Sequence, residues 1–432
     1  MALSPVRCGE LACQKDSYLK SMRTSVISCE KAAAPAATGK KKGKKDKGAA
    51  AEVYKVVLAD TVLFPEGGGQ PADSGTVGGV AANRVDNENG VAVHSLAGPV
   101  EVGAEVEVVV DWERRWDHAC QHTAQHLVTA VAVGQCGAET LSWNLGAEGS
   151  YLELDRNFDP EAHLGPLEAL VNEKILAGLA VSPEWHGVQA VNDGSVPGLR
   201  KSSKALPDSV TGPVRVLRMD GIDVNTCCGT HVKSLGHLQA VKFTKTERKK
   251  ASTLVHFVAG PRVLKAFGGC LDRERDIGLA LSAGPDLIVQ RLDDALKGKT
   301  DAERKNRALT KDLVDLRVEA LKAERARAGT KVFRVHRDSP SDMGDMGKVL
   351  ASAFDEACPD CVLLQTFGEG SKAGAFLISA SAPDLMDKAK TPIMDALDGK
   401  GGGKAGRFQG KCANLAGADD AVLNAAAALL AA

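Results

Sequence analysis

Two short histidine motifs constrain the fold of this 432-residue chain more than any other feature. His122-Thr-Ala-Gln-His126 is an HxxxH pair, and Cys227-Cys-Gly-Thr-His231, 101 residues further on, is a CxxxH pair. Histidines four residues apart share one face of a helix, so both rings can reach one ion. A thiolate and a third imidazole complete a four-ligand set of the kind that zinc favours. We therefore expect His122, His126, Cys227 and His231 to meet at one Zn2+ ion.

Two neighbours of these motifs are expected to lie outside the ligand set. His118 shares the helical face, but it is about 12 Å from His126 along the axis at 1.5 Å per residue, too far to share an ion. It is a candidate for contact with a ligand or with the substrate. Adjacent side chains of an extended segment point apart, so Cys227 is expected to be the ligand and Cys228 to pack nearby.

The residue after the first histidine of the HxxxH pair bears on which bond such a site could hydrolyse. The metalloprotease signature HExxH places a glutamate there as general base, whereas this chain has Thr123. Zinc can still polarise an ester carbonyl or lower the pKa of a bound water, and an ester is easier to cleave than an amide. The sequence therefore favours ester hydrolysis over peptide hydrolysis.

Composition limits the class of protein. The hydrophobic content of 44% and charged content of 25% are typical of globular proteins, and the length predicts two to four domains. The net charge of −1 gives no global positive field, and the aromatic content of 4% argues against base stacking as the main binding device. Eleven cysteines, an odd number, favour reduced thiols in a cytosolic compartment. No apolar run approaches the roughly 20 residues of a membrane span; an organellar transit peptide stays an open alternative.

Strand-like and helix-like segments alternate along the first part of the chain. They lie at 54–58, 105–110, 116–133 (which carries the HxxxH pair), 151–154, 167–179 and 214–219. The lysine-rich segment 31–51 is of low complexity and cannot bury a core. It is interpreted as a solvated loop, with a nuclear signal or a basic RNA tether as the alternatives.

The last third of the chain changes character. A heptad seam with charged flanks runs through Ala302, Asn306, Leu309, Leu313, Leu316, Ala320 and Ala323. Its alanines and asparagine favour an intramolecular hairpin or arm over a long dimeric coil. Residues 331–432 read as strand, helix, strand, strand and helix. Within them, 399–411 is predicted to be a basic glycine-rich loop whose Lys404, Arg407 and Lys411 could contact tRNA phosphates.

Taken together, these motifs resemble the editing domain of alanyl-tRNA synthetase and its freestanding relatives, the AlaX proteins. His122-Thr-Ala-Gln-His-Leu127 and Cys227-Cys-Gly-Thr-His-Val232 carry the resemblance, and Leu63-Phe-Pro-Glu-Gly-Gly-Gly-Gln-Pro71 matches the glycine-rich barrel motif of that family. The resemblance covers nearly the whole chain apart from the lysine-rich insertion. The family's CGGTH is CCGTH here, which keeps the ligand spacing.

The resemblance implies a zinc-dependent aminoacyl-tRNA hydrolase that acts in trans on mischarged tRNA(Ala), chiefly Ser-tRNA(Ala), with Gly-tRNA(Ala) as a second candidate. It implies a catalytic set of His122, His126 and Gln70. The residues expected to bind substrate are Gly67, Gly68, Gly69, Gln70, Thr123 and Thr230. The class II aminoacylation core has no room ahead of the editing-like region, so we do not expect tRNA charging. The alternatives are a non-catalytic tRNA-binding module with structural zinc and a zinc hydrolase of another small ester.

The expected fold is α+β and has four parts. An N-terminal β-barrel with the lysine-rich insertion occupies 1–112, and a zinc-containing α/β editing domain occupies 113–265. A helical hairpin or coiled-coil arm follows at 266–330, and a small C-terminal α/β domain occupies 331–432. The expected partner is tRNA(Ala) carrying a non-cognate amino acid, in the cytoplasm and away from membranes, with a monomer compatible with the sequence.

Overall fold

The computed structural model describes residues 4–32, 52–200, 212–344, 346–404 and 406–431. The chain forms two compact units, Met1–Arg275 and Asp276–Ala432. Both units mix helices and strands, so the predicted α+β class is confirmed. The predicted lysine-rich loop falls almost entirely on 33–51, outside the described residues. The finer division into four domains stays a prediction.

The N-terminal part of the first unit is a closed six-stranded barrel, as predicted. Its strands are β1 (Ser21–Lys31), β2 (Tyr54–Leu58), β3 (Gly75–Val77), β4 (Val80–Glu88), β5 (Val91–Leu96) and β6 (Glu105–Val110), in the order β1-β2-β5-β4-β3-β6. The short helix α1 (Ala12–Lys15) precedes them. Val56, Val85 and Val108 are fully buried inside the barrel, because alternate residues of each strand face its interior.

The rest of the first unit packs two antiparallel sheets around helices. One sheet has the order β12-β13-β8-β7, built from β7 (Thr140–Leu145), β8 (Ser150–Asp155), β12 (Val241–Arg248) and β13 (Ser252–Ala259). The other has the order β11-β10-β9, built from β9 (Val181–His186), β10 (Val214–Met219) and β11 (Asp223–Thr226). The helices are α2 (Trp112–Cys136), α3 (Pro160–Leu176), α4 (Val188–Asn192), the 3-10 turn η1 (Leu235–Leu238) and α5 (Pro261–Leu281), which crosses the boundary between the units.

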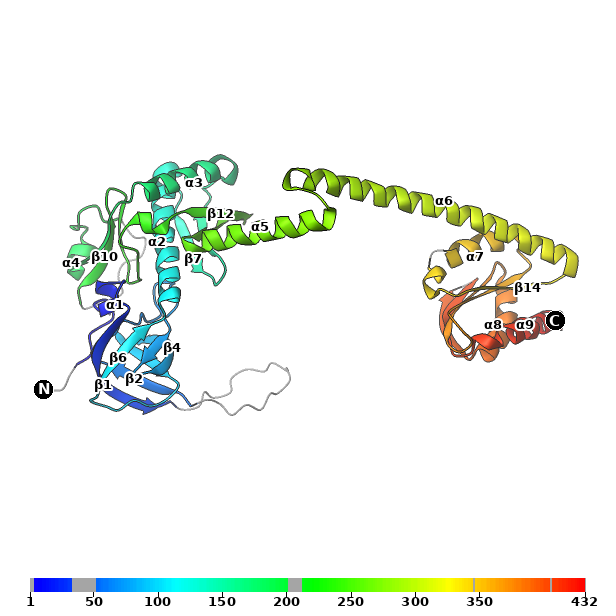
Figure 1. Ribbon diagram of the computed structural model, residues 1–432, viewed down its shortest axis with the longest axis horizontal. Coiled ribbons are helices and arrows are strands. Elements are labelled where there is room, and N and C mark those ends of the chain that lie inside the picture. The colour runs from blue at the N-terminus through cyan, green and yellow to red at the C-terminus, as the bar shows by residue number, and fades with distance from the viewer. Residues whose placement is uncertain (1–3, 33–51, 201–211, 345, 405, 432) are drawn as a thin grey trace. The chain divides into compact units, whose positions relative to one another are not determined.

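Helix α2 connects the barrel to this second core (Figure 1). Asp111 caps its N-terminus by accepting a hydrogen bond from the backbone N–H of Arg114, and Gly137 ends it with φ +65°. Arg115 is wholly buried, and its guanidinium binds the Asp73 carboxylate and donates to the carbonyl oxygens of Ser17 and Val62. This buried clamp fixes the first turn of α2 against the barrel.

The second unit is a five-stranded sheet with helices on both faces. The strand order is β14-β15-β16-β18-β17, with β14 (Val332–Arg337) and β15 (Val362–Phe367) parallel and the other neighbours antiparallel. Helices α8 (Pro383–Leu397) and α9 (Ala418–Leu430) share a core with Val362 and Leu364, whereas α6 (Ile288–Ala328) and α7 (Met346–Ala357) share one with Leu363. Strand β15 is therefore buried on both faces. The other strands of the sheet are β16 (Gly374–Ala380), β17 (Gly399–Lys404) and β18 (Arg407–Cys412), and the 3-10 turns are η2 (Pro285–Leu287), η3 (Pro340–Met343) and η4 (Leu415–Gly417).

The predicted glycine-rich loop at 399–411 is wrong. The segment is a β-hairpin of β17 (Gly399–Lys404) and β18 (Arg407–Cys412), paired from Gly399 with Cys412 to Lys404 with Arg407. Glycine is depleted in strands, which misled the prediction. Here it permits close strand approach, because a Cβ on Gly403 would lie 2.0 Å from the carbonyl oxygen of Arg407.

The predicted packing seam of the long helix is also wrong. Leu309, Leu313 and Leu316 are more than half exposed, whereas Val314, Val318 and Leu321 are buried. The buried face is rotated by about one residue, because it packs against helix α7 and the strand residues Phe333 and Leu363 and not along a heptad seam. Among the described residues, no helix is both long and apolar enough to cross a bilayer.

Candidate metal centre

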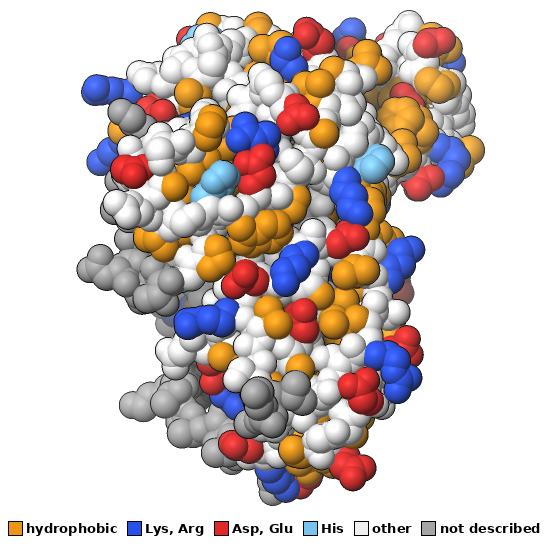
Figure 2. All heavy atoms as spheres, turned by 90° about the vertical axis from the view of Figure 1, so that its left-hand side faces the viewer, with side chains coloured by type: hydrophobic (Ala, Val, Ile, Leu, Met, Phe, Trp, Pro, Cys, Tyr) orange, Lys and Arg blue, Asp and Glu red, His pale blue; other side chains and the backbone are white. Residues whose placement is uncertain are grey.

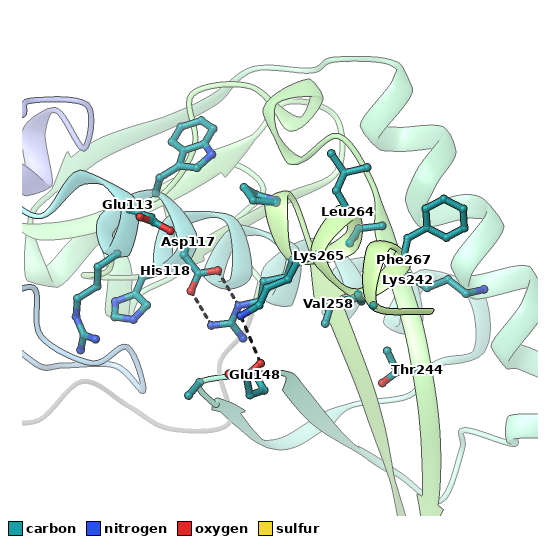
Figure 3. Close-up of a pocket in the computed structure, with 18 of the residues that line it drawn as sticks. Glu113, Asp117, His118, Glu148, Lys242, Thr244, Val258, Leu264, Lys265 and Phe267 are labelled. Carbon is teal, nitrogen blue, oxygen red and sulfur yellow. Dashed lines mark hydrogen bonds and ion pairs between the residues drawn. The ribbon is translucent and has the colours of Figure 1, made fainter. Parts of the chain in front are cut away.

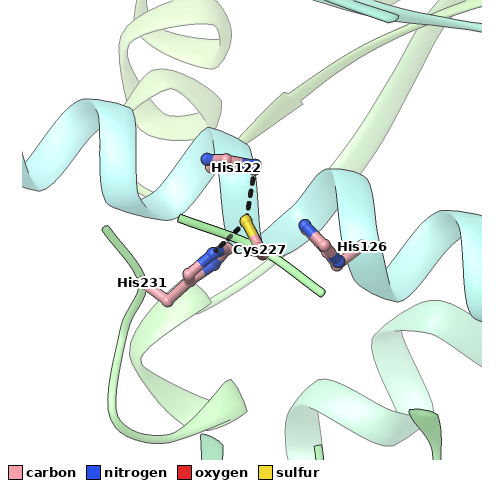
Figure 4. Close-up of side chains that lie close together, drawn as sticks. All are labelled: His122, His126, Cys227 and His231. Carbon is pink, nitrogen blue, oxygen red and sulfur yellow. Dashed lines mark hydrogen bonds between the residues drawn. The ribbon is translucent and has the colours of Figure 1, made fainter. Parts of the chain in front are cut away.

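The four predicted ligands lie together in the first unit. One nitrogen of each of His122, His126 and His231 and the Sγ of Cys227 all lie within 4.8 Å of one another (Figure 4). Cys227 Sγ is 3.5 Å from His122 Nε2 and 3.2 Å from His231 Nε2. Ligands around a tetrahedral zinc are about 3.5 Å apart, given zinc–ligand bonds of about 2.0–2.3 Å. The group therefore fits a metal ion of that size.

Helix periodicity and an irregular loop bring these side chains together. His122 and His126 lie one turn apart on α2, with ring centroids 5.1 Å apart. Cys227 and His231 belong to the irregular segment between β11 and η1, as the sequence predicted in allowing a loop there. The three imidazoles are at most 6% exposed. The loop thus closes over the helix and buries the donor atoms.

Gln70 orients His122 through hydrogen bonds. Its Oε1 accepts from the backbone N–H of Thr230 at 3.0 Å and lies 2.8 Å from His122 Nδ1, and its Nε2 donates to Thr230 Oγ1 at 2.8 Å. Because an amide oxygen only accepts, His122 Nδ1 carries the proton and its Nε2 keeps a lone pair toward Cys227. Gln70 is fully buried. This geometry gives Gln70 a positioning contact, and a direct catalytic role for it stays a prediction.

Thr123 orients His231 in a similar way. Its hydroxyl donates to the carbonyl oxygen of Ala119 at 2.8 Å and lies 3.1 Å from His231 Nδ1, where it can only accept. The backbone N–H of Val232 also donates to this oxygen. The residue that replaces the glutamate of HExxH is therefore engaged in holding a ligand, and its predicted contact with substrate stays untested.

The three glycines predicted to approach a ligand form a tight turn beside the centre. Gly67 and Gln70 exchange backbone hydrogen bonds, and Gly68 and Gly69 between them have φ values of +60° and +82°. Only residues without a Cβ adopt both values readily. A Cβ on Gly69 would also lie 2.8 Å from the ring of Trp143. The turn thereby delivers Gln70 to His122.

Gly229 is a functional position that the sequence motif contained but whose role it did not reveal. A Cβ at this position would lie 2.3 Å from His122 Nδ1 and 2.8 Å from Gln70 Oε1. The CxGTH segment therefore needs a glycine for the loop backbone to pass the ring of His122. Only the tertiary contact shows this.

Burial sets the protonation of the four candidate ligands. Burial lowers the pKa of His126 to about 3 and, with help from neighbouring imidazoles, holds the pKa values of His122 and His231 well below the usual range. Burial and the adjacent Cys228 raise the pKa of Cys227 to about 12, and Arg215 opposes this. The imidazoles thus offer free lone pairs, and binding of a metal to the thiol would release a proton.

Arg215 is a second residue that sequence reasoning missed. It lies on β10 and is 5% exposed, and its guanidinium donates to the backbone carbonyl oxygens of Cys227 at 2.7 Å and Gln14 at 3.0 Å. The positive charge sits beside the thiol ligand and favours its thiolate form. A lone arginine in a strand carried no signal in the sequence.

The remaining predicted residues lie in two places. Cys228 packs near the barrel core and within van der Waals reach of Gly67 and Gly68, as expected for a cysteine outside the ligand set. Lys404 and Arg407 lie in the second unit on the β17–β18 hairpin, together with Lys411. Arg407 is ion-paired with Asp355 at 3.1 Å. Contact of this hairpin with tRNA stays a prediction.

Charged side chains of both signs are mixed on the face that Figure 2 shows. This agrees with the net charge of −1. Recognition of an anionic partner must therefore rely on particular local contacts.

Comparison with known proteins assigns the family. Residues 214–254 match the family model described as "Threonyl and Alanyl tRNA synthetase second additional domain". The chain is 37% identical to alanyl-tRNA editing protein Aarsd1-A of Xenopus laevis over 400 residues, which are 92% of this chain and 93% of that protein. It is 36% identical to alanyl-tRNA editing protein Aarsd1 of Danio rerio, over 93% of this chain and 94% of that protein.

A more distant relative is a synthetase. Alanine–tRNA ligase of Methanobrevibacter smithii is 28% identical over 83% of this chain, but the match covers only 41% of the ligase. The near-complete match to the Aarsd1 proteins shows that the chain belongs to the family of alanyl-tRNA editing proteins, as the motifs had indicated.

Proposed function

We propose that this chain is a trans-editing deacylase that hydrolyses the ester of mischarged tRNA(Ala), chiefly Ser-tRNA(Ala), with Gly-tRNA(Ala) as a second substrate. The observation that carries the proposal is the buried group of three imidazoles and one thiol, in a chain that belongs to the alanyl-tRNA editing family. The partner is tRNA(Ala) that carries a non-cognate amino acid.

We assign the ion as zinc from the chemistry of the donor set. Borderline imidazole and soft thiolate ligands in a tetrahedral arrangement suit zinc, whereas magnesium and calcium prefer oxygen. His122, His126, Cys227 and His231 would hold it. When bound, zinc supplies a Lewis acid beside the ester carbonyl or lowers the pKa of a water molecule.

Hydrogen bonds from neighbouring side chains orient the imidazole rings of the metal centre. Gln70 presents the Nε2 lone pair of His122, and Thr123 presents that of His231. Such outer hydrogen bonds fix the tautomer and the ring orientation of metal-binding histidines. Selectivity for serine over alanine would come from a polar group that pairs with the serine hydroxyl, because a site built for a hydroxyl rejects an analogue without one.

A second candidate function has one observation in its favour. Four protein ligands fill a tetrahedral zinc, as in structural sites, whereas catalytic zinc usually keeps one position open. The four-residue group would then support a non-catalytic tRNA-binding module. The third candidate, hydrolysis of another small ester, uses the same site without tRNA.

One assay separates the three candidates. Purified protein is incubated with Ser-tRNA(Ala), Ala-tRNA(Ala) and a free serine ester, each with and without a zinc chelator. The editing enzyme releases serine from Ser-tRNA(Ala), spares Ala-tRNA(Ala) and loses activity with chelator. A binding module retains tRNA without turnover, and a general esterase cleaves the free ester equally well.

The ligand set is tested by a matched pair of cysteine variants. Cys227→Ala should abolish deacylation of Ser-tRNA(Ala) and lower the zinc content, because it removes the only thiolate of the group. Cys29→Ala, in barrel strand β1, should change neither. Full activity in a zinc-free Cys227→Ala protein would refute a catalytic role for the metal.

We also propose a cytoplasmic location. All eleven cysteines are free thiols, which supports a reducing compartment. Imaging of the tagged full-length chain tests this, and a purely organellar signal would contradict it.

A further inference from the structure

Aromatic side chains gather on the surface beside the metal loop. Tyr18, Trp112, Trp116 and His237 form a cluster in which neighbouring ring centroids are 5.5–6.1 Å apart. It contains two of the four tryptophans and one of the three tyrosines of the chain. The two tryptophans and the tyrosine are partly exposed, and His237 is exposed. We call these four residues the aromatic cluster.

Two lysines lie over the rings of the aromatic cluster. Lys20 Nζ is 4.7 Å from the ring centroid of Trp112, and Lys233 Nζ is 4.8 Å from that of Tyr18. Exposed aromatic faces flanked by cations are the device by which proteins hold unpaired bases and their phosphates. The alternative explanation is that these partly exposed rings only pack against one another. The unpaired side chain of His118, described below, distinguishes the two explanations.

The cluster is connected to the metal centre through the backbone. Tyr18 Oη accepts a hydrogen bond from the backbone N–H of Lys233, and Ser17 Oγ accepts one from that of His231. Trp116 and its neighbour His118 precede the ligand His122 on α2 by six and four residues, about 9 and 6 Å along the helix axis. The two tryptophans of the cluster therefore lie about two and three helical turns from His122 along α2.

A groove of about 1580 Å³ runs along the same turns of α2 (Figure 3). Trp112, Trp116 and His118 line it on the helix side, and Leu264 and Phe267 of α5 line it further along. None of the four metal ligands lines this groove. The groove is therefore a second surface, next to the metal centre and distinct from it.

The environment of His118 favours ligand binding over packing alone as the role of this surface. Its side chain is buried, with 5% of the residue exposed, and its Nδ1 has no hydrogen-bond partner among the described residues. An unpaired buried polar atom is costly and rare in a native structure. Its position in the lining of the groove indicates that a bound group completes the hydrogen bond.

The charge of the groove limits which kind of ligand could bind beside His118. Its lining includes five basic and four acidic side chains: Arg114, Lys242, Arg262, Lys265, Arg273, Asp111, Glu113, Asp117 and Glu148. Some are already paired, as Asp117 is with Arg262 at 2.6 Å. A nearly neutral groove is a poor match for the dense phosphates of a duplex. Aromatic faces and one unpaired imidazole match an exposed base and its ribose.

We propose that this groove and the aromatic cluster bind unpaired ribonucleotides at the 3′ end of the tRNA, immediately before the aminoacylated adenosine. The inference rests on the proposed function and deepens it. One base stacks on the Trp112–Trp116 face, and His118 Nδ1 pairs with a base amine or a ribose hydroxyl. The strand then leads the terminal ester along α2 to the metal centre.

The first experiment measures binding directly. Full-length protein is titrated with a single-stranded ribo-oligonucleotide that ends in CCA, and tryptophan fluorescence is followed. The oligonucleotide should quench the fluorescence, and a blunt RNA duplex should not. Trp116→Leu should weaken binding by roughly 5- to 150-fold, the usual effect of losing one base–aromatic stack. Tyr151→Leu, which removes a partly exposed ring on β8 beside His256, is the matched control and should bind normally.

The second experiment measures turnover. In deacylation of Ser-tRNA(Ala), Trp116→Leu should raise KM by a similar factor and change kcat much less. If Trp116→Leu folds poorly in a thermal melt, His118→Leu gives the test, because it fills the same space and should weaken RNA binding by roughly 2- to 12-fold. Zinc content serves as the check that the centre is intact.

The outcomes separate this inference from the proposed function. RNA binding that is unaffected in Trp116→Leu and His118→Leu would overturn the proposed binding site. Wild-type protein that binds the oligonucleotide through Trp116 and does not deacylate Ser-tRNA(Ala) would refute the editing function and support the groove. If the wild type is active and both Trp116→Leu and His118→Leu keep its KM, the proposed RNA-binding groove is refuted and the editing function is not.

Discussion

Replacing Gly229 by alanine should disrupt the metal centre through a single methyl group. The new Cβ would lie 2.3 Å from His122 Nδ1 and 2.8 Å from Gln70 Oε1. Carbon atoms in contact are normally about 3.5–4.0 Å apart, so the ring must retreat by about 1 Å. Metal–ligand distances tolerate only about 0.2 Å. His122 Nε2 can then no longer hold its place 3.5 Å from Cys227 Sγ.

The expected size of the effect follows from that displacement. Overpacking at a buried site costs about 1–3 kcal/mol of folding free energy. Disturbing the group that orients a metal-binding histidine weakens metal affinity by about 10- to 100-fold, and a 1 Å misplacement costs about 100-fold in rate. Gly229→Ala should therefore bind zinc at least 10-fold more weakly and lose most of its deacylation activity.

Zinc competition against a chromophoric chelator measures the affinity, and thermal unfolding with and without zinc measures the stability. Gly298→Ala is the matched control, because that glycine lies inside α6 of the second unit and a Cβ there meets no atom within 4 Å. Alanine at a helical position should stabilise slightly or have no effect. A Gly229→Ala protein whose zinc affinity stays within about threefold of wild type would show that the loop relaxes away from His122, contrary to this reasoning.

Three further changes test other contacts of the first unit. Gln70→Glu should keep zinc bound, because a carboxylate still accepts from His122 Nδ1–H, whereas Gln70→Ala should lose about 10- to 100-fold in affinity by the same competition assay; equal losses in both would argue against the positioning role. His94 is buried in the barrel, and burial lowers its pKa from 6.5 to about 4. The unfolded chain therefore takes up a proton between these values, so stability is complete above pH 6.5 and falls by up to about 3 kcal/mol as the pH drops toward 4. Urea unfolding at several pH values should show this slope in wild type and a flatter one in His94→Gln; identical slopes would contradict the assignment. Arg115→Met should cost about 3–5 kcal/mol because it leaves Asp73 buried without its partner, and a thermal melt lowered by less than a degree or two would refute the clamp.

The sequence predicted the parts of the site that depend on local spacing. Residues four apart on a helix must share a face, so the pairing of His122 with His126 followed from the sequence alone. The CxxxH motif contributed the other two donors by chemical type. Strand β6 and strand β10 were predicted at their observed bounds because alternation and turn residues mark them.

The parts that the sequence did not predict depend on contacts between distant segments. The role of Gln70 needs a barrel turn to meet residue 230, 160 positions away. The buried face of α6 could not be read from its heptads, because its packing partners are helix α7 and strands β14 and β15, which come later in the chain. The hairpin at 399–412 was hidden by its glycines, whose value lies in how closely two strands approach. The low aromatic content of the whole chain argued against base stacking, although Tyr18, Trp112 and Trp116 form a local cluster.

The separation of the ligands along the chain has a consequence for how the protein holds its shape. His122 and Cys227 are 105 residues apart, and every cysteine of the chain is a free thiol. An ion held by both closes a loop as long as those spanned by large disulfides, for which loss of unfolded-chain entropy is worth about 4–5 kcal/mol. The metal centre can thus act as a cross-link that a reducing compartment permits. Loss of the proposed zinc would therefore remove the proposed deacylase activity and loosen the barrel–helix unit in the same step.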